Sequence, residues 1–180
     1  MIHTPPRMLA LLALPLLLVA CGERDAADAP ANGAANDMVI PQPMQDFQDD
    51  GNVAEITIEG DDAMRFDIDR FTVNAGQMVR LTLIHTGNLP AQAMGHNVVI
   101  LVQDDDVFEF GADVGEQGGG QHDDFVPEAL RDRVVAFTAM IGGGETAVVE
   151  FQAPQETGEY PFLCSFPGHF GQMNGHMVVE

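Results

Sequence analysis

The sequence predicts an all-β fold, a two-layer β-sandwich that occupies residues 52–180. Short runs of alternating apolar and polar side chains are separated by turns rich in Gly, Asn and Pro, which is the pattern of half-buried strands. One continuous apolar run, Asn97–Val102, suits a strand buried on both faces. About eight strands in a domain of this length favour two packed sheets.

The individual strands can be placed in order along the chain. Gln77–His85 is the clearest, with Val79 and Leu83 on one face, and such alternation indicates an antiparallel sheet. Asp104–Arg133 interrupts the pattern with acidic residues and glycines and contains one short helix near Phe125–Arg131. The expected strands are Val53–Ile58, Met64–Ile68, Phe71–Val73, Gln77–His85, Asn97–Val102, Val134–Ile141, Thr146–Gln152, Glu159–Cys164 and Gly175–Glu180.

Residues 1–20 have the pattern of an export signal peptide. Arg7 precedes an apolar run, Met8–Ala20, which is shorter than the roughly 20 residues that a membrane span needs. The run ends in Leu18-Val19-Ala20-Cys21, which resembles the lipobox of bacterial lipoproteins and so implies cleavage before Cys21 and acylation of that residue. An ordinary signal peptide that happens to contain a cysteine is the alternative. Gly22 after the cysteine slightly favours the outer membrane over the inner one.

Residues 21–51 join this leader to the globular domain. The segment after Cys21 is rich in Ala, Asp, Asn, Gln and Pro, so we expect a disordered linker. A flexible chain of this length reaches about 30 Å. The sequence therefore predicts an exported protein of the periplasm or cell envelope, with a signal peptide at 1–20, a lipidated cysteine and linker at 21–51, and a β domain at 52–180.

The charge of the chain is strongly negative. The sequence contains no Lys, and its formal net charge is −21. Nucleic-acid binding is therefore excluded as a function class, because such proteins present basic surfaces to phosphates. An acidic surface would attract a partner with a basic docking surface. Adaptation to salt, or solubility alone, would explain the same charge.

The residues that point to chemistry lie in the last quarter of the chain. Cys164, His169 and Met173 follow one another at the spacing C-x4-H-x3-M, and His96 supplies a second imidazole from an earlier segment. Two His, one Cys and a weak axial Met form the ligand set of a type 1 copper site, which transfers one electron. The backbone carbonyl of Gly95 could approach the metal from the other side.

Two further residues are expected to support the ligands. Asn97 is placed to brace the two ligand loops by side-chain hydrogen bonds, and the backbone N–H of Phe166 could reach the cysteine sulfur. Cys21 and Cys164 are the two cysteines of the chain. If both have these functions, no structural disulfide remains, and the fold depends on core packing and on the metal.

Four segments of the chain carry a resemblance to a known family: HTGNLP at 85–90, MGHN at 94–97, IGGGE at 141–145 and YPFLCSFPGHFGQM at 160–173. They resemble segments of the azurins, in the cupredoxin family, in matching order. The resemblance implies an eight-stranded Greek-key β-sandwich with a short helical flap near Phe125–Arg131. Azurin's disulfide is absent here, because Ala54 and Gly76 stand near its positions, and Val98 replaces its core tryptophan.

The resemblance also implies a five-atom site for one copper ion. Its ligands would be the Gly95 carbonyl, His96, Cys164, His169 and Met173. In this family the electron leaves through the edge of the C-terminal ligand histidine, here His169, and through an apolar docking patch. Ordinary half-buried packing is the alternative for each member of that patch. The expected patch consists of Met64, Leu89, Pro90, Met94, Phe166, Pro167 and Phe170.

The leading hypothesis is a monomeric type 1 copper electron carrier, tethered to a membrane, that exchanges electrons with c-type cytochromes, reductases or oxidases. A copper enzyme would need further histidines, and the remaining three, His85, His122 and His176, are scattered. His85 is expected in the core and His122 in solvent. A binuclear site would need a second cysteine in the ligand loop. A copper-handling lipoprotein without a redox partner stays open as the alternative.

Overall fold

The computed structural model describes residues 52–180. The expected signal peptide, the lipidation site at Cys21 and the linker lie outside the described residues.

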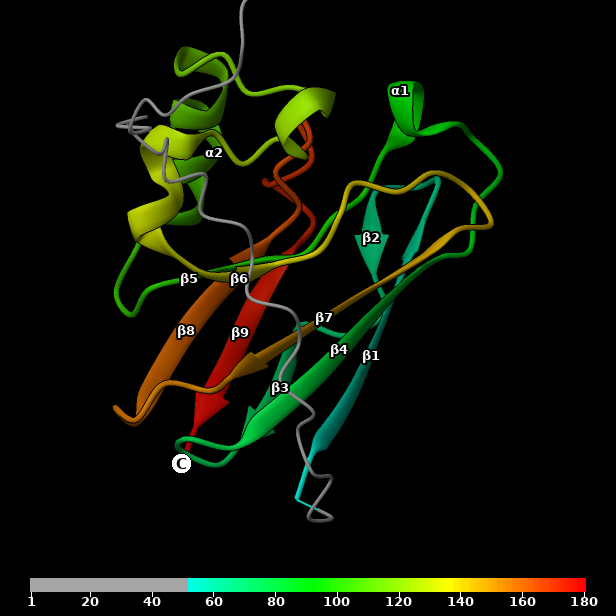
Figure 1. The fold of residues 1–180 in the computed structure, drawn as a ribbon. Helices are drawn as coiled ribbons and strands as arrows, with labels where there is room; N and C mark the ends of the chain where they lie inside the picture. Colours follow the sequence, from blue (N-terminus) through cyan, green and yellow to red (C-terminus); the bar gives the residue numbers. More distant parts are fainter. Residues whose placement is uncertain (1–51) are drawn as a thin grey trace, which may run out of the picture. The chain divides into compact units, whose positions relative to one another are not determined.

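The described part is a sandwich of two sheets, as predicted (Figure 1). One sheet has the order β2-β1-β4-β7 and the other β3-β9-β8-β5-β6. The strands of the first sheet are β1 (Ala54–Asp61), β2 (Arg65–Phe66), β4 (Met78–His85) and β7 (Thr146–Gln152). Those of the second are β3 (Arg70–Val73), β5 (Val99–Leu101), β6 (Val134–Phe137), β8 (Gly158–Leu163) and β9 (Asn174–Val179).

The described residues thus form nine strands, where the family resemblance implied eight. The two-residue strand β2 accounts for the difference, because it only closes a short hairpin with the end of β1. Thr146–Gln152 has the bounds that the sequence predicted. The strand expected at Asn97–Val102 is shorter, since β5 covers Val99–Leu101. Burial on both faces is confirmed for β5, whereas Val102 is exposed.

Two strand pairings are parallel, which corrects the expectation of a purely antiparallel sheet. β1 runs parallel to β4, with Ala54 opposite Val79 and Gly60 opposite His85, and β3 runs parallel to β9. Alternation of apolar residues reports that one face of a strand is buried, and it does so for either direction. The direction is decided instead by connections that carry the chain from one sheet to the other.

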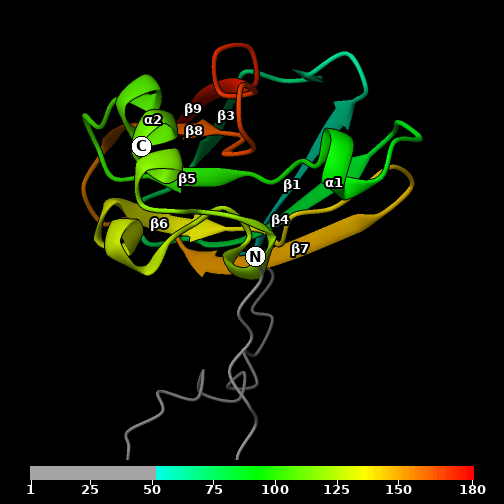
Figure 2. The ribbon, with the colours of Figure 1, turned by 90° about the horizontal axis from the view of Figure 1, so that it is seen from above.

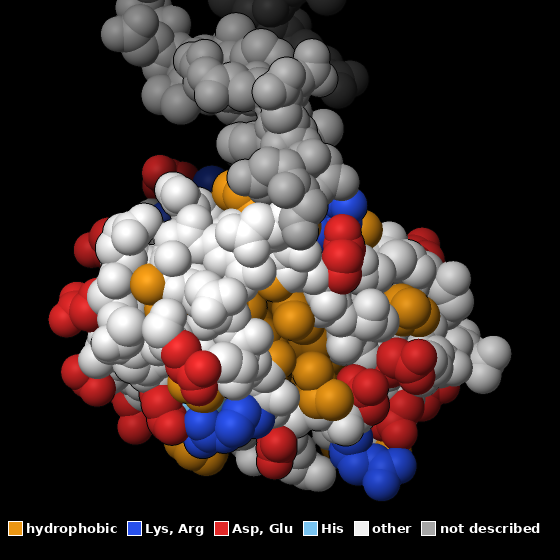
Figure 3. All heavy atoms as spheres, turned by 90° about the horizontal axis from the view of Figure 1, so that it is seen from below, with side chains coloured by type: hydrophobic (Ala, Val, Ile, Leu, Met, Phe, Trp, Pro, Cys, Tyr) orange, Lys and Arg blue, Asp and Glu red, His pale blue; other side chains and the backbone are white. Residues whose placement is uncertain are grey.

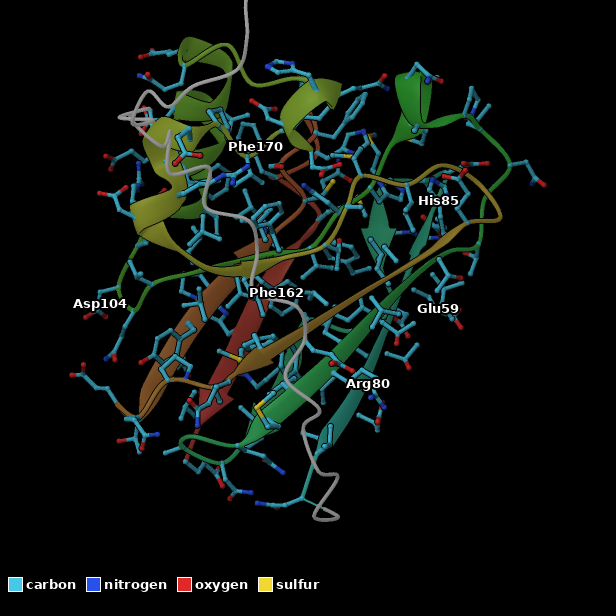
Figure 4. All side chains as sticks on the ribbon, viewed as in Figure 1. Glu59, Arg80, His85, Asp104, Phe162 and Phe170 are labelled. Carbon is cyan, nitrogen blue, oxygen red and sulfur yellow. The ribbon has the colours of Figure 1, made fainter. Side chains whose placement is uncertain are left out.

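The core lies between the two sheets. Ile58, Leu81 and Leu83 of the first sheet are fully buried. They belong to one cluster with Phe162 of β8, which Figure 4 labels, and with Phe71. The ring centres of Phe162 and Phe71 lie 5.7 Å apart. Burying side chains of this size contributes about 1.5–3 kcal/mol each, so the core can stabilise the fold without a disulfide.

The helical segments gather at one end of the sandwich. Seen from above in Figure 2, α2 lies over the sheet that contains β5 and β8, and α1 lies beside β1 and β4. Within residues 52–180 no helix is long and apolar enough to cross a membrane. The segments are α1 (Ala91–Met94), α2 (Val107–Glu116) and two 3₁₀ helices, Gln121–Asp123 and Glu128–Arg133.

The flap helix lies elsewhere than the sequence predicted. The expected helix near Phe125–Arg131 overlaps only a 3₁₀ turn, and the longest helix is α2. The Asp106 carboxylate caps α2 by accepting hydrogen bonds from the N–H groups of Phe108 (2.8 Å) and Glu109 (2.9 Å). Phe110 and its neighbours on one face are buried against the second sheet. The cap and this apolar face explain why the acidic segment is helical.

Arg133 fastens α2 to the sandwich. Its guanidinium donates to Asp105 (2.9 Å) just before the helix and to Asp113 (2.6 Å) within it, and it lies 5.3 Å from the ring centre of Phe110. The hydrogen bond from Arg133 is the main cause that lowers the pKa of Asp105 below its usual value. The pair is partly buried, so removing one partner costs more than it does for an exposed ion pair.

Replacing Arg133 by Met should therefore destabilise the protein by about 2 kcal/mol at neutral pH, because it leaves two carboxylates without their partner. The pKa of Asp105 is lowered in the folded state, so the stabilisation is present at neutral pH and is lost as the pH falls below about 4. Thermal melts of wild type and Arg133→Met should thus differ at pH 7 and converge in acid. Arg65→Met, which removes an exposed pair, is the control. Equal melting temperatures of wild type and Arg133→Met at pH 7 would contradict this assignment.

Candidate metal centre

Three buried donor side chains meet at the end of the sandwich where α1 and α2 lie. The ligand atoms of His96, Cys164 and His169 all fall within 4.8 Å of one another. The Cys164 sulfur is 3.9 Å from Nδ1 of His96 and 3.6 Å from Nδ1 of His169. The sequence-predicted convergence of two distant segments is therefore present in the fold.

His96 is oriented by contacts on every side. Its backbone pairs with Ile141 in an isolated antiparallel bridge, with N–H···O distances of 3.0 and 2.9 Å. Nε2 of its ring lies 2.9 Å from the backbone carbonyl of Asp61, at the end of β1. That carbonyl accepts the Nε2 proton and so leaves Nδ1 free to face the sulfur. The sequence analysis did not anticipate the role of Asp61, because a backbone acceptor carries no sequence signal.

A second histidine supports the first. His85 is fully buried and stacks on His96, with ring centres 4.2 Å apart. Its Nδ1 accepts the Gly87 N–H (3.1 Å), and its Nε2 lies 2.8 Å from the Met94 carbonyl, which fixes a neutral ring that donates from Nε2. The expected core position of His85 is confirmed, and its stacked ring restricts the orientation of the His96 ring.

The other donors belong to one compact loop. The Cys164 N–H donates to the Met173 carbonyl (2.9 Å), and the Met173 N–H donates to the His169 carbonyl (2.9 Å). The His169 N–H donates to Phe166 (3.0 Å), and Gly168 adopts a φ of +84°, which favours glycine. These bonds place Cys164, His169 and Met173 together in one loop.

Gly60 gives the site its room. A Cβ at this position would lie 2.9 Å from Cδ2 of His96 and 3.4 Å from Cε of Met173. Met173 is fully buried, and the Gly95 carbonyl lies 3.8 Å from the Cys164 sulfur on the far side of the loop. The absence of a side chain at Gly60 therefore lets both ligands occupy their positions.

Gly60→Ala should displace His96 or Met173 while leaving the sandwich folded. We expect a copper affinity reduced by about tenfold or more, with a changed electron paramagnetic resonance (EPR) spectrum, because the ligands must shift by several tenths of an ångström. Competition titration with a chelator measures the affinity. Gly115→Ala in α2, where an added Cβ meets nothing within 4 Å, is the matched control. If the two variants bind copper alike, Gly60 does not limit the site.

Asn97 joins the two ligand segments, as the sequence analysis expected. It is fully buried, and its Oδ1 accepts the Ser165 N–H (2.9 Å) beside the ligand cysteine. Its Nδ2 donates to Ser165 Oγ (2.8 Å) and to the Asp124 carbonyl (2.8 Å). One side chain thus links the residue after His96 to the residue after Cys164.

The electrostatics favour a bound cation. Burial raises the pKa of the Cys164 thiol to about 12, and the backbone N–H groups of Asn97 and Phe166 offset this only in part. Burial also lowers the pKa of His169 to about 4 and that of His96 below its usual value. The imidazoles are therefore neutral and ready to bind a metal at pH 7, whereas the sulfur becomes a thiolate only beside a cation.

The donor set identifies the metal. A buried thiolate, two imidazoles and the thioether of Met173, all on a rigid frame, match copper in a type 1 site. The fold and the site together define a blue copper protein with one copper ion. Such proteins carry electrons and are not enzymes.

Comparison with known proteins gives the family. The chain belongs to the copper binding proteins of the plastocyanin/azurin family, whose pattern matches residues 53–180. It is 40% identical over 124 residues to azurin from Alcaligenes faecalis, covering 67% of this chain and 94% of that protein. It is 39% identical over 133 residues to outer membrane protein H.8 from Neisseria meningitidis serogroup B, covering 72% and 68%.

Solved structures agree on the fold. Auracyanin from Roseiflexus castenholzii superposes with a TM-score of 0.62 at 31% identity, covering 71% of this chain and 97% of that one. Azurin iso-2 from Methylomonas sp. strain J gives a TM-score of 0.61 at 30% identity, covering 71% and 98%. The predicted all-β cupredoxin fold is thus confirmed.

The members of the expected docking patch all reach the surface to some degree. Leu89, Pro90 and Pro167 are exposed, whereas Met64, Met94, Phe166 and Phe170 are half-buried. Among the ligands only His169 has any exposed surface (3%), and its ring centre lies 4.6 Å from that of Phe166.

The other two histidines lie outside the cluster of donors. His122 is exposed beside Asp123, and His176 is a half-buried residue of β9.

Proposed function

We propose that this protein is an exported, lipid-anchored carrier that passes one electron at a time between redox proteins of the cell envelope. The observation that carries the proposal is that three strong donors from two distant segments converge within 4.8 Å of one another, each oriented by hydrogen bonds to the surrounding chain. Copper supplies the one-electron chemistry, and a frame that hardly rearranges keeps the barrier to electron transfer low. Cys164 and Met173 are also fully buried, which suits a site that exchanges electrons and does not bind a substrate.

The electron is proposed to leave through His169 and the apolar patch that surrounds it. His169 is the ligand nearest to solvent, and Phe166 and Pro167 lie beside it in the same loop. Weak electron-transfer complexes use small contact areas, for which a few exposed apolar side chains suffice. Gly95 O as a fifth ligand, and the N–H of Phe166 as a donor to the sulfur, belong to the same proposal.

The proposed partners are c-type cytochromes, reductases or oxidases with basic docking surfaces. The five arginines of residues 52–180 are all ion-paired with acids, so the excess negative charge is left to attract such a partner. Figure 3 shows arginines lying beside acidic side chains on one face. A monomer suits a carrier that must leave each partner quickly.

The anchor is proposed at Cys21, with the outer membrane as its site. A relative that is 39% identical is named outer membrane protein H.8, which supports this location. The linker to residue 51 would then let the copper domain move between partners while it remains attached. A single acyl chain binds a membrane only weakly, so stable anchoring needs more than one acyl chain or a second binding signal. A lipobox cysteine is acylated on both its sulfur and its new amino group, which would supply the required chains.

Cys21→Ser tests the anchor directly. We expect the variant to move from the membrane fraction to the soluble fraction of the cell envelope, because the hydrophobic chains that hold it are lost. Immunoblots of fractions washed at high salt measure this, and the salt wash removes proteins held by charge alone. A variant that stays with the membrane would show that another segment anchors the chain, including the apolar leader if it remains uncleaved without the lipobox cysteine.

The electron-carrier function is tested with purified, copper-loaded protein. We expect an intense blue absorption band, a narrow EPR hyperfine splitting, and rapid oxidation of the reduced form by a basic c-type cytochrome in stopped-flow mixing. A protein that binds copper tightly but exchanges electrons slowly with itself and with such cytochromes would instead be a copper-handling lipoprotein.

A further inference from the structure

One large apolar side chain near the metal centre is left in solvent. Phe108, in the first turn of α2, is 57% exposed, more than any other large hydrophobic residue of the described part. The buried face of the helix is formed by Phe110, Gly111 and Val114, so Phe108 points away from the core. An exposed aromatic ring of this kind often marks an interaction surface when it adjoins other apolar groups.

Phe108 does adjoin such a group. Its ring packs edge-on against Phe170, with ring centres 6.2 Å apart, and Phe170 directly follows the ligand His169. Figure 4 shows Phe170 at the metal end of the sandwich, next to α2. The aromatic pair is thus continuous with the ligand loop through the peptide chain itself.

A glycine in α2 makes this contact possible. A Cβ at Gly111 would lie 2.4 Å from the Phe170 ring, so only glycine lets that ring settle on the helix. Gly171, which follows Phe170, lies beside the Phe108 ring, and a Cβ there would be at an ordinary contact distance of 3.8 Å. The Phe170 ring is therefore seated on α2, and the Phe108 ring extends its apolar surface toward solvent.

The surroundings of the pair are acidic. Asp104, Asp106 and Glu109 are exposed next to Phe108 in the chain. The cations of this region are already used, because Arg133 pairs with Asp105 and Asp113, and Arg131 pairs with Glu128. The exposed Phe108 ring is therefore an apolar contact surface that is bordered by negatively charged side chains.

We propose that Phe108 and Phe170 form an aromatic extension of the docking surface, which binds a redox protein whose apolar contact face is rimmed by Lys and Arg. The inference rests on the proposed electron-carrier function and adds a specific anchor to it. A rigid aromatic side chain gives a large contact area at a small entropic cost, which is why such residues dominate binding at interfaces. The acidic rim directs the encounter and sets its dependence on salt.

A second copy of this chain does not fit the same surface. Two copies facing each other through Phe108 would bring Asp104, Asp106 and Glu109 against their own like charges. Like charges placed together across an interface repel each other and disfavour the complex. With a basic partner, the electrostatic interaction across the interface is attractive.

Phe108→Ser in the full, copper-loaded protein tests the proposal. With a basic c-type cytochrome as the probe, we expect the second-order rate constant for electron transfer to fall about tenfold. With ferricyanide, which is too small to need docking, the rate should not change, and neither should the absorption and EPR spectra. Glu109→Gln should weaken the salt dependence of the reaction with the cytochrome, and it should leave the reaction with ferricyanide unchanged.

The matched control is Val148→Ser, which removes a 54% exposed apolar side chain from β7 in the other sheet. It should leave both rates unchanged. An unchanged cytochrome rate for Phe108→Ser, or an equal fall for Val148→Ser, overturns the aromatic extension while leaving the carrier function intact. A wild-type protein that reacts with ferricyanide but with no cytochrome overturns the proposed function as well.

Discussion

Cys164→Ser is expected to abolish the blue colour of the copper-loaded protein. The intense band of a type 1 site arises from charge transfer between the thiolate and copper, and a serine oxygen cannot replace it. Cys164 is fully buried, and its sulfur lies 3.6 Å from one ligand nitrogen and 3.9 Å from the other. No neighbouring thiol in residues 52–180 could take its place.

The measurement is visible absorption and EPR of the variant after addition of copper. We expect the band to vanish, the hyperfine splitting to widen to that of an ordinary copper complex, and the affinity to fall by at least 100-fold. His122→Ala, which changes an exposed histidine outside the cluster, should keep the wild-type spectra. A blue Cys164→Ser protein would exclude the proposed ligand set altogether.

Asn97→Leu should produce the largest loss of stability among the residues around the metal. The substitution removes the acceptor of the Ser165 N–H and the donor to the Asp124 carbonyl, and both partners then lack a hydrogen bond inside the protein. An unsatisfied buried polar group costs about 1–3 kcal/mol, so we expect a loss of about 3 kcal/mol in the free energy of unfolding.

Thermal unfolding of the copper-free protein measures this effect without the contribution of the metal. The melting temperature should fall by about 10 °C. Gln172→Leu replaces an exposed amide in the ligand loop and is the matched control, for which the melting temperature should be close to that of wild type. If Asn97→Leu also melts like wild type, the link between the two ligand segments contributes little to the stability of the fold.

The ligand loop could be predicted because its information is local. Cys164, His169 and Met173 lie within one turn-rich segment, and Pro167 and Gly168 favour the turn that brings them together. The fully buried run Val98–Leu101 could also be predicted, because successive apolar residues in a strand require that both of its faces are buried.

The helix α2 was missed although its signals are present. Asp106 is a favourable N-cap, and Phe110 and Val114 are four residues apart on one face. The surrounding acids and glycines concealed this pattern, so the sequence analysis placed the flap helix near Phe125–Arg131. The exposed position of Phe108 depends on the phase of this helix and could not be found without it.

Residue types and their spacing determined the chemistry of this protein: a thiolate, two imidazoles and a thioether, which are the donor set of a type 1 copper site, on a chain of short strands. The tertiary structure alone decided the parallel pairing of β1 with β4, the Asp61 carbonyl that orients His96, and the contact of Phe108 with Phe170. The physical reason is that donor chemistry belongs to each side chain. Distances between residues far apart in the chain depend instead on strand pairing and helix packing, which are summed over the whole core.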